Sequence, residues 1–377
     1  MYLFVNIISL KFVFLNMILY NIFMKKIALT GGGTAGHITP NLALIPELEK
    51  RNFDVIYIGS KTGMEKDIIE RRNIPYFGVT ADKLRRYIDV KNLVMPMNVI
   101  FGIRQAKKIL KENKVDILFS KGGFVSVPVV IAASQLGIPI ISHEADFTPG
   151  LANKIAAPFS KIICTNFEET AKMFGKKGVH TGCPIRQRLL DGKKEKGLEF
   201  LDFNTTKPIM FVTGGSLGSK YINDLIRSNL DKLLDKMNIV HSCGQGKYEK
   251  DLEYRIGYKQ FELIRDELPD VLAASGVIVS RAGANILFEL LALKKLNLLI
   301  PLTTKASRGD QILNAKSFSK KNYSIVLNEE DQDKNPNLFF EKLAELNRRR
   351  DELIEAMSKS KTINAVKTIC DIIEKEA

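Results

Sequence analysis

The stretch Lys26-Ile27-Ala28-Leu29-Thr30-Gly31-Gly32-Gly33-Thr34-Ala35-Gly36-His37 joins a short apolar run to a glycine-rich turn and the start of a helical pattern. A second stretch of this kind, Ile209-Met210-Phe211-Val212-Thr213-Gly214-Gly215-Ser216-Leu217-Gly218-Ser219, begins the second half of the chain. Glycine lets a backbone turn tightly and approach a ligand closely. A helix behind such a turn offers free N–H groups and a positive dipole end to an anion. Two such turns predict two Rossmann-like halves that face each other across a cleft.

Short apolar runs alternate with helical patterns on either side of these turns. The runs lack regular polar positions, as expected for strands buried on both faces of a parallel sheet. The sequence therefore predicts an α/β fold with two Rossmann-like domains. We expect strands at 26–30, 54–58, 117–120, 138–142, 161–164, 209–213, 238–242, 261–265, 276–280, 297–301 and 323–327, and helices such as 41–51, 64–73, 99–113 and a broken one at 336–374.

The 377 residues exceed one typical core, so two domains are expected. Residues 191–207 are charged and polar, which is typical of a linker and a surface loop. The predicted parts are an apolar extension at 1–24, an N-terminal domain at 25–186, a linker at 187–207, a C-terminal domain at 208–360, and a helix at 361–377 that is a candidate to pack back on the N-terminal domain.

Residues 1–23 are nearly all apolar, and Lys11 is their only charged side chain. As a helix this segment would span roughly 34 Å, enough to cross a bilayer. The first strand follows at once, however, and leaves no linker. Because Met24-Lys25-Lys26-Ile27 also resembles a natural start, we favour translation from Met24 over a membrane anchor. A signal peptide is disfavoured by the missing basic start and cleavage site.

The formal net charge of +14 favours anionic partners such as a nucleotide, a phosphorylated lipid, a membrane surface or nucleic acid. Nine basic and two acidic residues lie in 83–114, interleaved with apolar ones. This mixture suits an anionic membrane interface, and the alternative is a core helix with a solvated basic face. The four cysteines and four histidines are scattered, so we expect free thiols and no metal site.

The first glycine turn satisfies the dinucleotide fingerprint G-x-G-x-x-G. The next predicted strand ends Tyr57-Ile58-Gly59-Ser60-Lys61, without the carboxylate that would hold a ribose, which argues against NAD or FAD. An ATP-type P-loop pattern is absent from the sequence. In the second half, Glu289 lies on an otherwise apolar helical pattern and needs a polar partner, either a ribose diol or a basic side chain. Gln311, at a predicted helix start, is a candidate for sugar hydroxyls or for helix capping.

Six ordered motifs resemble the MurG family of N-acetylglucosaminyltransferases, which act in bacterial peptidoglycan synthesis. The likeness runs from about 25 to 375 and rests on residues 32–37, 143–146, 182–186, 214–216, 281–284 with Glu289, and 310–315. The resemblance implies a glycosyltransferase-B architecture, with UDP-N-acetylglucosamine bound mainly by the C-terminal domain and a lipid acceptor mainly by the N-terminal one. The implied reaction is inverting and transfers N-acetylglucosamine to the C4 hydroxyl of undecaprenyl-pyrophosphoryl-N-acetylmuramyl-pentapeptide, without metal or cofactor.

The resemblance also implies partners and a location. The partners are UDP-N-acetylglucosamine, the lipid I acceptor and an anionic membrane surface, with cell-wall synthesis and division proteins as candidates and no nucleic acid. The location is peripheral, at the cytoplasmic face of the cell membrane. Where many members have His-Glu-x-Asn, this chain has His143-Glu144-Ala145-Asp146, so Asp146 or Asn153 would replace the asparagine. The other residues carried over are Thr34, Ala35 and Gly36 for the sugar, Arg186 and Ser216 for the diphosphate, Ile264 for uracil, Ala284 to Glu289 for the ribose, and Gln311 for the sugar hydroxyls.

His37 closes the first glycine turn and is our candidate for the general base, since an ordinary histidine pKa of about 6.5 suits this role. Asp146 and Glu144 are second choices, and a structural or acceptor-binding role for His37 is the alternative. The turn at Lys121-Gly122-Gly123-Phe124 is a candidate for the acceptor pyrophosphate. Competing functions are a UDP-N-acetylglucosamine 2-epimerase, a basic membrane or nucleic-acid module without catalysis, and an oxidoreductase.

Overall fold

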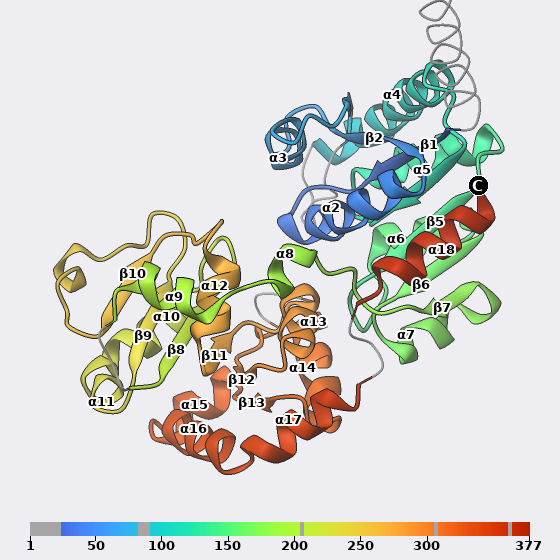
Figure 1. The fold of residues 1–377 in the computed structure, drawn as a ribbon. Coiled ribbons are helices and arrows are strands. Elements are labelled where there is room, and N and C mark those ends of the chain that lie inside the picture. Colours follow the sequence, from blue (N-terminus) through green and yellow to red (C-terminus); the bar gives the residue numbers. More distant parts are fainter. Residues whose placement is uncertain (1–23, 82–90, 204–206, 305–307, 361–363) are drawn as a thin grey trace, which may run out of the picture.

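The structure is a computed structural model that describes residues 24–81, 91–203, 207–304, 308–360 and 364–377. The predictions for the extension before Met24 and for the first part of the basic segment, up to residue 90, lie outside the described residues. Figure 1 shows two halves, each built around one twisted sheet with helices on both faces. Among the described residues, no helix is both long enough and apolar enough to cross a membrane.

The N-terminal sheet has seven parallel strands in the order β3-β2-β1-β4-β5-β6-β7. The five predicted strands are confirmed with small shifts at their ends. The sequence analysis missed β3, which is only partly buried, and β7, a three-residue edge strand. The strands are β1 (Lys25–Thr30), β2 (Phe53–Ser60), β3 (Tyr76–Val79), β4 (Ile117–Ser120), β5 (Ile140–Glu144), β6 (Ile162–Thr165) and β7 (Gly178–His180).

The C-terminal sheet has six parallel strands in the order β10-β9-β8-β11-β12-β13. The strand predicted at 261–265 is wrong, because the chain leaves the sheet after Phe261. The edge strand β10 has alternating buried and half-buried positions, and the apolar run that follows it packs as a loop. The strands are β8 (Ile209–Thr213), β9 (Asn238–Ser242), β10 (Tyr258–Phe261), β11 (Val277–Ser280), β12 (Leu296–Leu299) and β13 (Ile325–Val326).

Each sheet buries apolar side chains on both of its faces. Ile27 and Leu29 of β1 belong to one cluster, and the intervening Ala28 belongs to the cluster on the other face, as the alternation along a strand requires. The N-terminal helices are α2 (Ala35–Lys50), α3 (Met64–Glu70), α4 (Lys91–Glu112), α5 (Ser126–Gln135), α6 (Leu151–Ala156), α7 (Glu168–Met173) and the short η1 (Gly175–Lys177). The C-terminal helices are α8 (Gln187–Leu190), α9 (Lys194–Leu201), α10 (Lys220–Ser228), α11 (Leu230–Leu234), η2 (Lys250–Leu252), α12 (Leu268–Ala274), α13 (Ala284–Ala292), α14 (Asp310–Lys320), α15 (Glu329–Lys334), α16 (Leu338–Arg348) and α17 (Arg350–Ser358), and α18 (Val366–Glu376) ends the chain.

The segment predicted as a linker, 187–207, contains two packed helices, α8 and α9, in its described part. Leu201 of α9 is buried in the same cluster as Ile209 of β8. A Cβ atom at Gly197 would lie only 2.1 Å from the carbonyl oxygen of Asp270, so α9 and α12 pack backbone to backbone. The polar composition of this stretch reflects the solvent face of α9. The described part of the stretch therefore belongs to the C-terminal domain.

The last helix, α18, returns to the N-terminal half and packs on α2 (Figure 1). Ile369, Cys370 and Ile373 are buried in the cluster that contains β1. Arg51 at the end of α2 binds the carboxylates of Asp371 at 2.8 Å and Glu374 at 2.9 Å. The predicted broken helix at 336–374 is thus three helices, α16 to α18, and the last of them completes the N-terminal core.

We expect Ile369→Ala to lower the free energy of unfolding by about 2–5 kcal/mol, because it leaves a cavity between α18 and β1. Urea unfolding followed by circular dichroism measures this loss. Thr368→Ala changes an exposed neighbour on the same helix and is the matched control. Equal losses in the two variants would show that α18 contributes nothing to the N-terminal core.

Candidate active site

The four glycine-containing turns follow β1, β4, β8 and β11, the central strands of the two sheets. In each sheet the strand order reverses at this pair, β1 beside β4 and β8 beside β11. Ligands of open parallel sheets bind at such switch points, outside the carboxyl ends of the strands. The topology therefore brings the motifs found in the sequence to one cleft between the halves.

The first glycine turn is fixed by a buried carboxylate. Glu65 of α3 accepts hydrogen bonds from the Ser60 N–H at 3.0 Å, the Ser60 hydroxyl at 2.6 Å and the Gly33 N–H at 3.3 Å. A Cβ atom at Gly32 would lie 2.6 Å from the Glu65 carboxylate, so a side chain there would displace it. This acid near the end of β2 thus holds the turn and is already engaged. Glu65 is therefore not available to bind a ribose, in agreement with the expectation that no ribose-binding carboxylate ends β2.

His37 lies in the first turn of α2, and its Nδ1 is 2.9 Å from the Thr34 hydroxyl. Burial, followed by the nearby charges of Lys121 and Arg308, lowers the His37 pKa to about 3. The sequence-based assumption of an ordinary pKa is therefore wrong for this site. The imidazole is neutral at pH 7, as a base must be, but its burial and the two nearby positive charges make it a weak one.

Glu144 and Asp146, the other candidates for the base, are held by hydrogen bonds. Glu144 is buried and accepts from the N–H groups of Asp146 and Gly150 and from the side-chain amide of Asn153, at 2.8–3.0 Å. Its pKa is raised by burial and by the charge of Asp146. Because the Asn153 amide group is committed to Glu144 and to the His143 carbonyl, it is not free to replace the asparagine missing at 146.

Asp146 joins the two domains through Asn314 of α14, whose amide nitrogen donates to it at 3.1 Å. The Asn314 side-chain oxygen accepts the Phe147 N–H at 2.9 Å, and its nitrogen also donates to the Ala282 carbonyl at 3.2 Å. Burial raises the Asp146 pKa, and the Asn314 hydrogen bond opposes this shift. Asn314 was part of a sequence motif without an assigned role, and in the structure its side chain links the two halves by hydrogen bonds.

Gly36 makes a second link across the cleft. Its carbonyl accepts a hydrogen bond from the Asn285 side chain at 2.9 Å. Thr34 is exposed beside it, and Ala35 is the first residue of α2. Gly36, one of the residues predicted to contact the sugar, therefore lies against the start of α13, where Ala284 is the first helical residue.

Glu289 of α13 is half-buried at this seam, and no hydrogen bond or ion pair holds its carboxylate within the described parts of the chain. Burial raises the Glu289 pKa to about 7, and the nearby charge of Arg186 opposes this shift. Arg186 has a buried Nε atom that is likewise without a partner. Glu289 thus does not form the salt bridge that was the alternative. Its carboxylate is a hydrogen-bond acceptor without a partner, and the nearby Arg186 Nε–H is a donor without a partner.

Gln311 of α14 has its side-chain oxygen committed to the protein. It accepts the N–H groups of Ala282 at 3.2 Å and Leu302 at 3.1 Å, and so ties together the loops that follow β11 and β12. Its amide nitrogen is left to donate elsewhere. The capping alternative is not seen, because Gly309 occupies the N-cap of α14.

The second glycine turn, Gly214 to Ser219, follows β8 and leads into α10, as expected. α10 begins at Lys220, and the Ser219 hydroxyl caps it by accepting the Ile222 N–H at 3.3 Å. Ser216 is exposed in the intervening turn. Ile264 is buried beside Ile185 and Leu189, which places it in the wall of the C-terminal domain.

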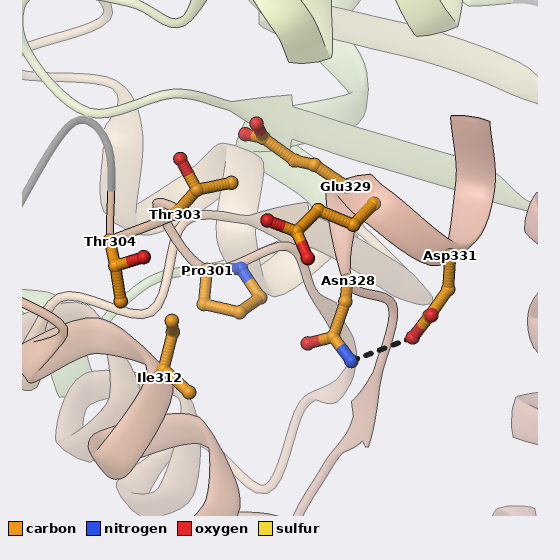
Figure 2. A pocket seen from close by; sticks show the side chains of 8 residues that line it. Pro301, Thr303, Thr304, Ile312, Asn328, Glu329 and Asp331 are labelled. Carbon is orange, nitrogen blue, oxygen red and sulfur yellow. Dashed lines mark hydrogen bonds between the residues drawn. The ribbon is translucent and has the colours of Figure 1, made fainter. Parts of the chain in front are cut away.

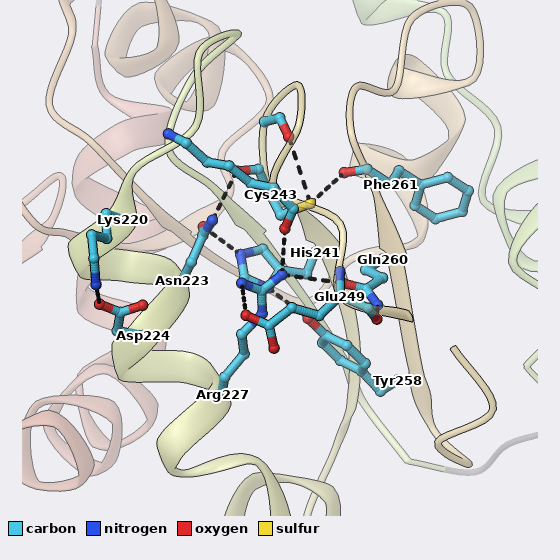
Figure 3. Close-up of polar contacts among 12 residues, drawn as sticks. Lys220, Asn223, Asp224, Arg227, His241, Cys243, Glu249, Tyr258, Gln260 and Phe261 are labelled. Atoms are coloured by element: carbon cyan, nitrogen blue, oxygen red, sulfur yellow. Dashed lines mark hydrogen bonds and ion pairs between the residues drawn. The ribbon is translucent and has the colours of Figure 1, made fainter. Parts of the chain in front are cut away.

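A buried polar network that the sequence analysis missed supports this turn (Figure 3). His241 Nε2 donates to the Asn223 side-chain oxygen at 3.0 Å, and the Tyr258 hydroxyl donates to His241 Nδ1 at 2.8 Å. The Asn223 amide donates to the Cys243 carbonyl at 2.9 Å, against which Gly218 packs. Burial and the charge of Arg227 lower the His241 pKa to about 3. The residues of this network are single positions on separate elements, so no local sequence pattern predicts it.

A cavity of about 290 Å³ lies beside α14, at the carboxyl ends of β12 and β13 (Figure 2). None of the predicted site residues lines it. Glu329 in its wall forms an ion pair with Arg281, which also donates to Ser219 at 2.6 Å. The arginine of the 281–284 motif is thus structural and connects the α10 cap to β12. The lining residues are Pro301, Thr303, Thr304, Ile312, Asn328, Glu329, Glu330 and Asp331.

Sequence profiles match both halves: the Glycosyltransferase family 28 N-terminal domain covers residues 27–165, and the Glycosyltransferase family 28 C-terminal domain covers residues 209–373. This chain belongs to glycosyltransferase family 28. A family relative from Clostridium botulinum (strain Kyoto / Type A2) is 55% identical over 354 residues, which are 93% of this chain and 99% of the relative. Its name is UDP-N-acetylglucosamine--N-acetylmuramyl-(pentapeptide) pyrophosphoryl-undecaprenol N-acetylglucosamine transferase.

Solved structures agree with this family assignment. Acinetobacter baumannii MurG superposes with a TM-score of 0.73 at 25% identity, covering 93% of this chain and 99% of that protein. The UDP-GlcNAc 2-epimerase from Neisseria meningitidis, solved with UDP-GlcNAc bound, has a TM-score of 0.63 at 14% identity, covering 93% and 100%. The second likeness shows a shared fold alone. The predicted glycosyltransferase-B architecture of two Rossmann-like domains is confirmed.

Because the folded state holds His241 neutral with a pKa of about 3, the unfolded chain binds more protons between that value and about 6.5. We therefore expect the free energy of unfolding to fall as the pH drops through this window. His241→Gln should reduce the slope by up to about 1.4 kcal/mol per pH unit. Tyr258→Phe, the control, removes one hydrogen bond but keeps the slope. Urea unfolding at a series of pH values tests this, and an unchanged slope in His241→Gln would contradict it.

Proposed function

We propose that this chain transfers N-acetylglucosamine from UDP-N-acetylglucosamine to the C4 hydroxyl of undecaprenyl-pyrophosphoryl-N-acetylmuramyl-pentapeptide, the conversion of lipid I to lipid II. The supporting observation is the 55% identity to the clostridial transferase over nearly the full length of both chains. The cleft supports it independently, because it places an unpaired carboxylate and an unpaired arginine beside a helix start. These are the groups that a nucleoside diphosphate sugar requires.

The C-terminal domain, at about 208–360 with the packed helices α8 and α9 before it, is proposed to bind the donor. The Glu289 carboxylate accepts hydrogen bonds from the two ribose hydroxyls, and Ile264 packs against uracil. Arg186 and Ser216 donate to the diphosphate, which lies near the start of α13 at Ala284. Gln311 donates its free amide N–H to a sugar hydroxyl, because its oxygen is already bound by two backbone N–H groups.

The N-terminal domain, at about 25–186, is proposed to bind the acceptor. Thr34, Ala35 and Gly36 approach the sugar from this side, and Asp146 accepts a hydrogen bond from it. The turn after β4 receives the acceptor pyrophosphate. In the tautomer whose Nδ1–H donates to the Thr34 hydroxyl, the Nε2 lone pair of His37 takes the proton from the C4 hydroxyl. The C4 oxygen then bonds to C1 of the sugar, the C1–O bond breaks, and UDP leaves with the electron pair on the opposite face.

The acceptor carries a lipid, so the enzyme is proposed to bind the cytoplasmic face of the membrane. α4 has one exposed stripe that is apolar at Met97, Ile100 and Phe101 and basic at Arg104, Lys108 and Lys111. Its opposite face is buried at Ala106 and Leu110. A helix that is apolar and basic on its exposed side suits the surface of an anionic bilayer.

The first test is transfer of radiolabelled N-acetylglucosamine from UDP-N-acetylglucosamine to a lipid I analogue by the purified full chain. We expect labelled lipid and released UDP in equal amounts. Conversion of the donor to its 2-epimer without labelled lipid would instead support the epimerase.

Glu289→Gln should raise the KM for the donor by about 10-fold to 100-fold, since a hydrogen bond to a charged group is lost. In the unaltered enzyme, we expect this KM to rise as the pH falls below about 7, where Glu289 becomes protonated. A donor with a 2′-deoxyribose is the control: it should bind the native enzyme more weakly but the variant equally well. If the variant still discriminates between the two donors, Glu289 does not hold the ribose.

Phe101→Ser should weaken binding to vesicles of anionic lipid by about tenfold, because burial of a large apolar side chain contributes about 1.5–3 kcal/mol. Met173→Ser is the matched control, since Met173 is equally exposed but lies on α7. Vesicle sedimentation measures the binding, and turnover of a short-chain acceptor should stay unchanged in both variants. If the two variants bind vesicles equally well, α4 does not contact the membrane.

A further inference from the structure

Lys121 is the residue that the described site leaves unexplained. It directly follows β4 at the switch point of the N-terminal sheet, and its side chain is only 1% exposed. Within the described residues its ammonium group makes no hydrogen bond and no ion pair. Burial accordingly lowers the Lys121 pKa. An unpaired buried cation is costly, so a counter-charge from outside the chain is expected.

The acidic groups around Lys121 are already engaged elsewhere. Glu144 accepts three hydrogen bonds and Asp146 is bound by Asn314, and neither carboxylate lies within 4 Å of the ammonium. Two buried polar atoms nearby also lack partners: His143 Nδ1, on the ring next to Lys121, and Asn153 Oδ1, which faces Gly122. The neighbourhood therefore has free hydrogen-bonding capacity and an excess positive charge.

Glycines of the turns after β1 and β4 pack closely around this position. A Cβ atom at Gly31 would lie 3.1 Å from the Lys121 Cβ, and one at Gly123 would lie 2.5 Å from the Gly32 carbonyl. Gly122 and Gly123 both have positive φ, at 85° and 82°, which favours glycine. The turns after β1 and β4 thus form a cradle with Lys121 at its floor, beside the side chains of Asn153 and His37. Backbone N–H groups next to a cation suit phosphate oxygens.

We propose that the Lys121 ammonium receives the diphosphate of the acceptor at the floor of this cradle, and that the resulting neutralisation makes His37 a competent base. The inference rests on the proposed function. It adds Lys121 as a residue that binds the acceptor, and it has the acceptor bind before His37 acts as the base. We assign Lys121 to the diphosphate of the acceptor and not to that of the donor, because Lys121 belongs to the N-terminal sheet. Arg186 and α13 lie on the donor side. His37 would then gain basicity only when the acceptor is in place.

Two positive charges act on His37, and they come from different elements. Lys121 lies after β4 and Arg308 lies before α14, and both lower the His37 pKa. Arg308 is already paired with Asp310 at 2.8 Å, so Lys121 is the uncompensated one. Glu65 is turned to Gly33 and Ser60, and Asp146 interacts electrostatically with both Lys121 and Arg308. A bound diphosphate would remove the effect of Lys121 and raise the His37 pKa.

The test compares Lys121→Met, which keeps most of the side-chain volume, with Lys121→Arg, which keeps the charge. We expect Lys121→Met to raise the acceptor KM by about tenfold or more, with UDP affinity changed less than about twofold. The acidic limb of kcat/KM for the acceptor should move to higher pH, because one cation beside His37 is gone. Lys121→Arg should restore part of the acceptor affinity. Lys295→Met, which removes a half-buried lysine far from the cleft, is the control and should change only thermal stability.

A second measurement uses the unaltered protein and therefore does not depend on the variant folding. The His37 imidazole, assigned by its loss in His37→Gln, is titrated by NMR with and without inorganic pyrophosphate, farnesyl diphosphate or UDP. We expect the two pyrophosphates, but not UDP, to raise the His37 pKa. An unchanged pKa, or an effect of UDP alone, would overturn the proposal. If the pyrophosphates raise the His37 pKa but the native enzyme does not label the lipid, the result instead counts against the proposed transferase function.

Discussion

The close approach of two backbone turns at the carboxyl ends of β1 and β4 is the constraint on which the site depends. Gly32 and Gly123 meet where a side chain on either would collide with the other turn or with Glu65. Because no Cβ intervenes, His37 at the start of α2 and Lys121 at the end of β4 are held in one place. Glu65 fixes the geometry by accepting hydrogen bonds from the turn and from β2.

The cleft is closed by polar contacts rather than by a large apolar surface alone. Asn314 and Asn285 each connect a backbone or side-chain atom of the N-terminal half to α13 or α14. Phe167 adds an edge-to-face contact with Phe288 at 5.1 Å between ring centres. A few hydrogen bonds between domains can be exchanged for substrate contacts at modest cost. The proposed donor site and the contacts between the domains therefore share two helices, α13 and α14.

The sequence was sufficient for the fold, since continuous apolar runs mark strands buried on both faces and glycine turns mark their carboxyl ends. It failed at 261–265, where an apolar run packs as a loop, and at 187–207, where a polar composition reflects one face of a packed helix. In the candidate site, the isolation of Glu289 on an apolar helix was visible in the pattern. The depressed His37 pKa was not, because it arises from burial and from Lys121 and Arg308, which lie far away in the sequence.

The charges of the cleft fall into two classes that differ in their partners. Glu65, Glu144 and Arg281 are saturated by hydrogen bonds or ion pairs, and they hold turns and caps in place. Lys121, Arg186 and Glu289 are buried or half-buried without such partners within the described residues. An unsatisfied charge lowers stability, so it persists only where a ligand compensates it. Lys121 and Arg186 offer positive charge to diphosphates, and Glu289 offers a hydrogen-bond acceptor to a ribose. The reacting atoms of the two substrates would meet between these three residues, at His37.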